Sequence, residues 1–265
     1  MERRLINAAK KYQKELVKFL RDLVAIPSES CCEKEVVLRI KKEMQKKGFD
    51  NITLDGMGNL LGRIGTGKKI IAMDAHIDTV GVGSRKLWKW DPYEGKLQNG
   101  LVFGRGAVDQ KAGMASMVYG AKIMKELKLL DDFSLYVTGT VQEEDCDGLC
   151  WQYIIKKTGL KPECVVITEP TNLHIYRGQR GRMEIEVTTY GKAAHASAPE
   201  RGKNAVYAMS RITAEIEKLN KRLKTDRFLG KGSIAVTYID CKTPSLCAVP
   251  DESRIHLDRR LTLGE

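Results

Sequence analysis

Four short segments of the sequence carry side chains that could bind a metal ion or move protons. In DAHID, Asp74, His76 and Asp78 occupy alternate positions, so all three point to one side of an extended chain. The other candidates are carboxylates: Asp109 in GRGAVDQKAG, Glu143 and Glu144 in VQEED, and Glu169 in ITEP. Clustered carboxylates raise one another's pKa, which a divalent cation relieves. One imidazole among several carboxylates suits Zn²⁺, Co²⁺ or Mn²⁺.

Hydrophobic patterning predicts elements that would carry these side chains to one place. Apolar runs predict buried strands at 69–75, 133–141 and 164–168, and each run ends at one of the polar groups. A patterned helix at 112–127 begins just after Asp109. In open α/β sheets, ligands bind beyond the carboxyl ends of the strands. The four segments are therefore expected to meet at one edge of one sheet.

The other elements expected before residue 180 complete an α/β fold. They are helices at 3–24, 34–47 and 149–157 and strands at 51–55 and 60–64. Strands that alternate with helices favour a sheet with helices on both faces.

The pattern changes near residue 180. Segments 183–191, 232–241 and 253–261 alternate apolar and polar residues, as strands with one wet face do, and a helix is expected at 203–222. We therefore expect two domains, a catalytic metal-binding domain at 1–180 and a smaller α+β domain at 181–265.

Composition and charge exclude several functions. The chain has 265 residues and a net charge of +11. Its basic clusters lie on predicted amphipathic helices without interleaved aromatic residues, which disfavours nucleic-acid binding, a hypothesis that rests on charge alone. It contains no apolar run of about 18 residues and no apolar signal-peptide core, so no membrane partner is expected. Seven Cys without CxxC pairs favour a reducing, cytoplasmic location.

The motifs AHIDTV, GRGAVDQKAG, VQEED and ITEPT, in this order, resemble those of the co-catalytic dizinc hydrolases. That family includes acetylornithine deacetylase, succinyl-diaminopimelate desuccinylase, aminoacylase, glutamate carboxypeptidase and dipeptidases. YGKAAHASAPERGKNA and CAVPDESRIHLDRRLT resemble parts of its inserted lid domain. Among its branches, the sequence resembles a hydrolase group associated with selenium metabolism. The implied fold is a zinc-exopeptidase-like catalytic sheet plus an inserted α+β lid (dimerisation) domain.

The resemblance implies a role for each candidate residue. His76 and Glu169 would bind one metal, Glu144 the second, and Asp109 both. Three further residues would take catalytic roles: Glu143 as the general base, Asp78 as the partner that orients the imidazole, and His195 of the lid as the stabiliser of the oxyanion.

The implied activity is metal-dependent hydrolysis of an amide bond in a small N-acyl amino acid or dipeptide, through a metal-bridging hydroxide. A homodimer formed through the lid is the implied assembly. The alternative is a non-catalytic binding or regulatory relative, because the family pattern also has a downstream His ligand. This sequence ends at Glu265 within the lid pattern, so we expect a fragment or a divergent form with weak binding of the second metal.

Overall fold

The computed structural model describes residues 1–265, which form two compact units, Met1–Leu173 and His174–Glu265. Each unit has its own sheet and its own apolar core.

The first unit is built on a five-stranded mixed sheet in the order β1-β2-β6-β3-β7. Its strands are β1 (Asn51–Leu54), β2 (Leu60–Ile64), β3 (Lys69–His76), β6 (Phe133–Thr140) and β7 (Cys164–Ile167). β3 pairs in parallel with both β6 and β7, whereas β1 and β2 are antiparallel to their neighbours. The carboxyl ends of β6, β3 and β7 therefore lie side by side.

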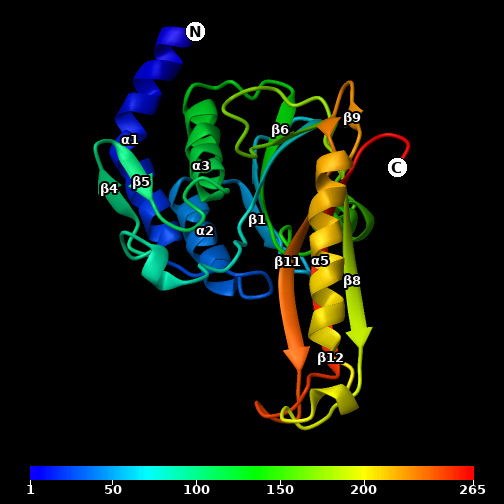
Figure 1. The fold of residues 1–265 in the computed structure, drawn as a ribbon. Helices are drawn as coiled ribbons and strands as arrows, with labels where there is room; N and C mark the ends of the chain where they lie inside the picture. The colour runs from blue at the N-terminus through cyan, green and yellow to red at the C-terminus, as the bar shows by residue number, and fades with distance from the viewer. The chain divides into compact units, whose positions relative to one another are not determined.

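Helices cover both faces of this sheet. The first face packs against α1 (Glu2–Val24), α2 (Lys34–Lys46) and α3 (Lys111–Glu126), which together form the main core (Figure 1). The second face packs against α4 (Leu149–Tyr153) and the π-helical turn η2 (Ile154–Thr158) that continues it. Two small elements connect β3 to α3 along the chain. They are a short 3₁₀ turn, η1 (Arg85–Leu87), and the hairpin of β4 (Lys96–Gln98) and β5 (Leu101–Phe103).

In the second unit, helix α5 (Ala205–Arg222) packs on a three-stranded antiparallel sheet in the order β11-β12-β8 (Figure 1). The strands are β8 (Gly181–Tyr190), β11 (Ser233–Lys242) and β12 (Glu252–Leu261). Ile255 and Leu257 of β12 are buried under the helix with Met209 and Ile234, while the residues between them are less buried. A short 3₁₀ turn, η3 (Pro199–Arg201), and a hairpin of β9 (Thr225–Asp226) and β10 (Gly230–Lys231) complete the unit.

Every helix and strand named from the sequence is present, with ends displaced by one or two residues in most cases. The hairpins β4-β5 and β9-β10 were not expected, because strands of two or three residues carry no periodic pattern. The units divide between Leu173 and His174, whereas the sequence pattern placed a boundary at residue 180. None of the helices combines the length and the apolar character needed to span a bilayer.

Candidate metal centre

The carboxyl ends of three parallel strands bring the candidate residues of the first unit together. His76 is the last residue of β3, Glu143 and Glu144 follow β6, and Glu169 follows β7. The ends are tied by main-chain hydrogen bonds, from the Ile77 amide to the Thr140 carbonyl (2.9 Å) and from the Thr168 amide to the Asp74 carbonyl (3.0 Å). Three of the four segments expected at one sheet edge therefore meet there.

His76 is 2% exposed and lies among acidic groups. Its Nε2 is 2.8 Å from Asp109 Oδ1 and 3.9 Å from both Glu143 Oε2 and Glu169 Oε1. Its Nδ1 is 3.0 Å from the Asp78 carbonyl oxygen and 3.4 Å from Asp78 Oδ1. The ring is therefore fixed at one nitrogen, and the other nitrogen faces a group of carboxylates.

Three of the predicted metal ligands already lie at metal-binding separation. One ligand atom from each of His76, Asp109 and Glu144 lies within 4.8 Å of the other two. Glu169 adjoins this group through its 3.9 Å separation from His76 and accepts a hydrogen bond from the Gln110 side-chain amide. Gln110, which the sequence reasoning did not single out, is itself held by the Thr168 hydroxyl at 2.8 Å.

Asp78 makes more contacts than the predicted one with the imidazole. It is fully buried, and its two oxygens accept main-chain hydrogen bonds from Glu143 and Glu144, both at 3.1 Å. The hydroxyl of Ser30, a residue not foreseen from the sequence, donates to the same carboxylate at 2.7 Å. Asp78 thus connects the end of β3 to the turn after β6, and its predicted role in orienting His76 stays a prediction.

The pKa values show a cluster that attracts positive charge. Burial alone lowers the pKa of His76, but hydrogen bonds with Asp109 and Asp78 outweigh burial and raise it to about 11. Burial raises the pKa of Glu143 to about 7, with His76 opposing the rise and Glu169 adding to it. Burial also raises the pKa of Glu144 and of Glu169, and the neighbouring Asp109 carboxylate adds to both.

This arrangement fits a divalent cation. The donors are one imidazole nitrogen and several carboxylate oxygens, the set that zinc, cobalt and manganese accept. A cation bound among them would neutralise the carboxylates, which in its absence are neutralised by protons on His76 and the glutamates. The individual ligand roles stay predictions.

His195, the remaining predicted site residue, belongs to the second unit. It is exposed, its Nδ1 is 2.8 Å from the Ser197 hydroxyl, and its backbone pairs with Ala248 in an isolated bridge. Its proposed action on an oxyanion stays a prediction.

The family model described as peptidase family M20/M25/M40 matches residues 72–256, a range that contains every candidate site residue. The chain belongs to this family. The membership confirms the resemblance inferred from the motifs, and it makes the metal-binding interpretation of the strand-end cluster the expected one for an M20 chain.

Two curated relatives illustrate the range of similarity. The M20 chain is 58% identical over 261 residues to YgeY of Escherichia coli K12, a protein described as uncharacterized, covering 98% of this chain and 65% of YgeY. It is 30% identical over 220 residues to a probable succinyl-diaminopimelate desuccinylase of Staphylococcus epidermidis, covering 80% of this chain and 53% of the relative. The chain therefore spans about two thirds or about half of the length of these relatives.

Solved structures share the fold at low sequence identity. An M20 metallo-carboxypeptidase, Sso-CP2 of Sulfolobus solfataricus, superposes with a TM-score of 0.71 at 21% identity over 96% of this chain and 71% of that one. The dipeptidase Dug1p of Saccharomyces cerevisiae gives a TM-score of 0.73 at 14% identity over 99% and 72% of the two chains. The expected α/β fold class is confirmed.

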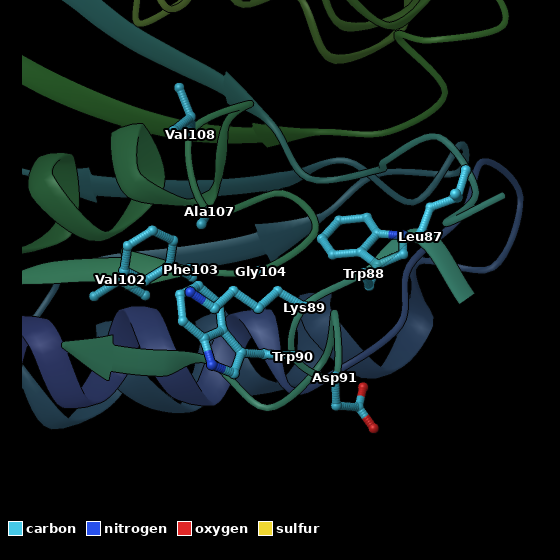
Figure 2. A pocket seen from close by; sticks show the side chains of 10 residues that line it. All are labelled: Leu87, Trp88, Lys89, Trp90, Asp91, Val102, Phe103, Gly104, Ala107 and Val108. Atoms are coloured by element: carbon cyan, nitrogen blue, oxygen red, sulfur yellow. The ribbon is translucent and has the colours of Figure 1, made fainter. Parts of the chain in front are cut away.

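A pocket of about 370 Å³ lies beside the segment that leads to Asp109 (Figure 2). Its lining is mainly apolar and aromatic, and includes Trp88, Trp90 and Phe103. The rings of Trp90 and Phe103 are 4.7 Å apart between centroids, an edge-tilted pair of the favourable kind. Val108 also lines the pocket, so the wall ends one residue before Asp109.

Proposed function

We propose that this M20 chain belongs to a metal-dependent hydrolase that cleaves an amide bond in a small N-acyl amino acid or dipeptide. The observation that carries the proposal is the cluster of His76, Asp109 and Glu144, with ligand atoms within 4.8 Å of one another at the sheet edge where Glu143 also lies. Family membership supports hydrolysis as the reaction class.

Four side chains would hold the two metal ions, with His76 and Glu169 on one, Glu144 on the other and Asp109 on both. A bound zinc ion supplies a positive charge that polarises a carbonyl group and lowers the pKa of water. Cobalt or manganese would suit the same oxygen-rich donors.

Glu143 would move the proton. Burial raises the pKa of its carboxyl group, whereas a cation bound beside it would lower the pKa and keep it a carboxylate that can accept a proton. We infer that Glu143 takes a proton from the attacking water and then gives it to the nitrogen of the leaving amine. Asp78 supports this role, because its carboxylate accepts a hydrogen bond from the main-chain amide of Glu143 and so holds the backbone of that residue in place.

The test is Glu143→Gln, which keeps the size of the side chain but cannot accept the proton. N-acetyl and N-succinyl amino acids and dipeptides would be assayed with zinc present. We expect kcat to fall by about 10²- to 10⁴-fold, with the zinc affinity nearly unchanged. Undiminished turnover in the variant would show that Glu143 is not the base. Tight zinc binding by the wild-type protein without any turnover would favour a non-catalytic relative.

A further inference from the structure

The turn that carries Glu143 and Glu144 is held through its main chain. After β6 ends at Thr140, Gln142 adopts φ +59°, a left-handed conformation uncommon for residues other than Gly. The three amides that follow Val141 all donate to carboxylates. Gln142 donates to Glu33 Oε1 at 3.0 Å, and Glu143 and Glu144 donate to Asp78 at 3.1 Å each.

Glu33 is a buried carboxylate that the proposed reaction does not use. It is 6% exposed and immediately precedes α2, where its carbonyl oxygen accepts the Val37 amide. A carboxylate that accepts a main-chain amide makes a charge-assisted hydrogen bond, which is stronger than a neutral one. The buried Glu33 side chain thus fixes the first amide of the left-handed turn.

The loop that contains Glu33 also holds the end of β3. The Ser28 hydroxyl donates to the Ile77 carbonyl at 2.8 Å, and the Thr79 amide donates to the Ser28 carbonyl at 2.9 Å. The Ser30 hydroxyl donates to Asp78 at 2.7 Å. One loop, Ser28–Glu33, therefore sets both the segment after His76 and the turn of Glu143 and Glu144.

We propose that Glu33 is a positioning residue for Glu143 and Glu144, acting through the Gln142 amide. The proposal rests on the function proposed above, because it assigns Glu33 a part in keeping the Glu144 ligand and the Glu143 base in place. Without this acceptor, the Gln142 amide loses its partner and the turn can relax from its left-handed conformation. The Glu144 carboxylate then loses its fixed distance to His76 and Asp109.

Three variants of the 265-residue chain test this proposal: Glu33→Ala removes the acceptor, Glu33→Gln keeps an acceptor without the charge, and Glu35→Ala is the control. Glu35 is an exposed acid two residues away, in the first turn of α2. Zinc affinity would be measured by calorimetric titration, and amide hydrogen exchange at residues 142–144 by NMR.

For Glu33→Ala we expect zinc binding to weaken by about 10- to 100-fold, the usual loss for residues that support metal ligands. Exchange at 142–144 should speed up selectively, Glu33→Gln should be intermediate, and Glu35→Ala should match the wild type. If the role of Glu33 were purely structural, Glu33→Ala would lower the overall stability without selectively speeding amide exchange at residues 142–144. If Glu33→Ala does not fold, Glu33→Gln decides by the same two measurements.

Two outcomes separate this inference from the proposed function. If wild-type protein binds zinc and Glu33 variants match it in both affinity and exchange, the positioning role is wrong and the proposed function stands. If wild-type protein binds no zinc, the proposed function fails. Exchange at the Gln142–Glu144 amides then decides by itself whether Glu33 fixes the turn.

Discussion

His76 has acidic partners at both ring nitrogens, with Asp109 at Nε2 and Asp78 at Nδ1. Such a ring is fixed in orientation, because neither nitrogen can turn away without leaving a buried polar atom unpaired. Substitution of His76 is therefore the most direct test of the proposed metal site.

His76→Ala should remove the high-affinity zinc equivalent. We expect the affinity to fall by more than about 100-fold, beyond the range for residues that only support ligands. His256→Ala is the matched control, since His256 lies on β12 of the second unit and contacts the Thr237 hydroxyl at 3.0 Å. Elemental analysis with zinc titration gives the measurement. Equal zinc binding by both variants would remove His76 from the ligand set.

The sequence singled out the candidate ligands by residue type, and it did not single out Glu33, Ser30 or Gln110, which contact the candidate residues or the turn that carries them. His76 and Glu144 stand out because their types and positions after strands suit a metal, and Asp109 because it is a carboxylate just before a helix. Glu33 carries no such signal, since a Glu before a helix is ordinary and its partner is a main-chain amide. Ser30 carries none either, since a Ser in a loop is ordinary and its partner, Asp78, lies 48 residues away in the sequence. Main-chain partners are set by the fold, so a single sequence does not reveal them.

Among the elements, α3 closely approaches Thr168, the residue that follows β7, at Gly113. A Cβ at this position would overlap the Thr168 side chain, whose hydroxyl also holds Gln110. Gly113→Ala should therefore destabilise the fold by about 1–3 kcal/mol, the usual cost of overpacking. Denaturant unfolding monitored by Trp fluorescence measures the change.

Gly120 on the same helix is the control, because a Cβ there has no atom within 4 Å. Gly120→Ala should stabilise by about 0.5–1 kcal/mol, because Ala favours a helix interior. If Gly113→Ala also proved stabilising, the inference that α3 packs too closely against Thr168 to accept a Cβ would be wrong.

The contact between α1 and α2 at Asp22 predicts a pH dependence. Burial raises the pKa of Asp22, but hydrogen bonds from Lys18 and Arg39 outweigh burial and hold it below its usual value. The stabilisation from a lowered pKa is complete above the unfolded-state pKa of about 3.9 and disappears as the pH falls through the folded-state value.

Asp22→Asn should cost about 0.5–1 kcal/mol at pH 7, and the difference from the wild type should shrink as the pH falls below the unfolded-state value. Urea unfolding of both proteins between neutral pH and pH of about 3 measures the difference. A cost that stays constant across this range would rule out the ionised carboxylate as its source.

The long elements could be predicted because each has a clear period. In β12, Ser253, Ile255 and Leu257 are buried while the residues between them are less so, which is the alternation visible in the sequence. The strand order β2-β6-β3-β7 could not be predicted, since pairing depends on packing between distant segments. The rule that parallel strands end at one edge was enough to expect the candidate residues at that edge without knowledge of the full strand order.

At the scale of the whole molecule, the two units have separate cores and the candidate ligands belong to the first one. All three Trp residues (88, 90 and 151) also lie in Met1–Leu173, so Trp fluorescence reports that unit alone. Zinc at a free concentration of about 100 Kd should stabilise the unit by about 2.7 kcal/mol. That raises its unfolding midpoint by about 5–11 °C.

Hydrogen exchange of β11 and β12 gives the matching measurement for the second unit. We expect zinc to slow exchange in β3 and β6 and to leave β11 and β12 unchanged, because binding stabilises the unit that holds the ligands. Equal slowing in both units would mean that they unfold together as one cooperative body.

The main-chain support of the Gln142–Glu144 turn bears on how this site can evolve or be redesigned. Asp78 and Glu33 hold amides that every residue except Pro possesses, so they place no demand on the side chains at 143 and 144. Those two positions can therefore accept other ligands or other acids and bases by single mutations while the turn stays folded. Because the main-chain hydrogen bonds do not depend on these side chains, the reactive groups of the turn can change during evolution while its backbone structure is kept.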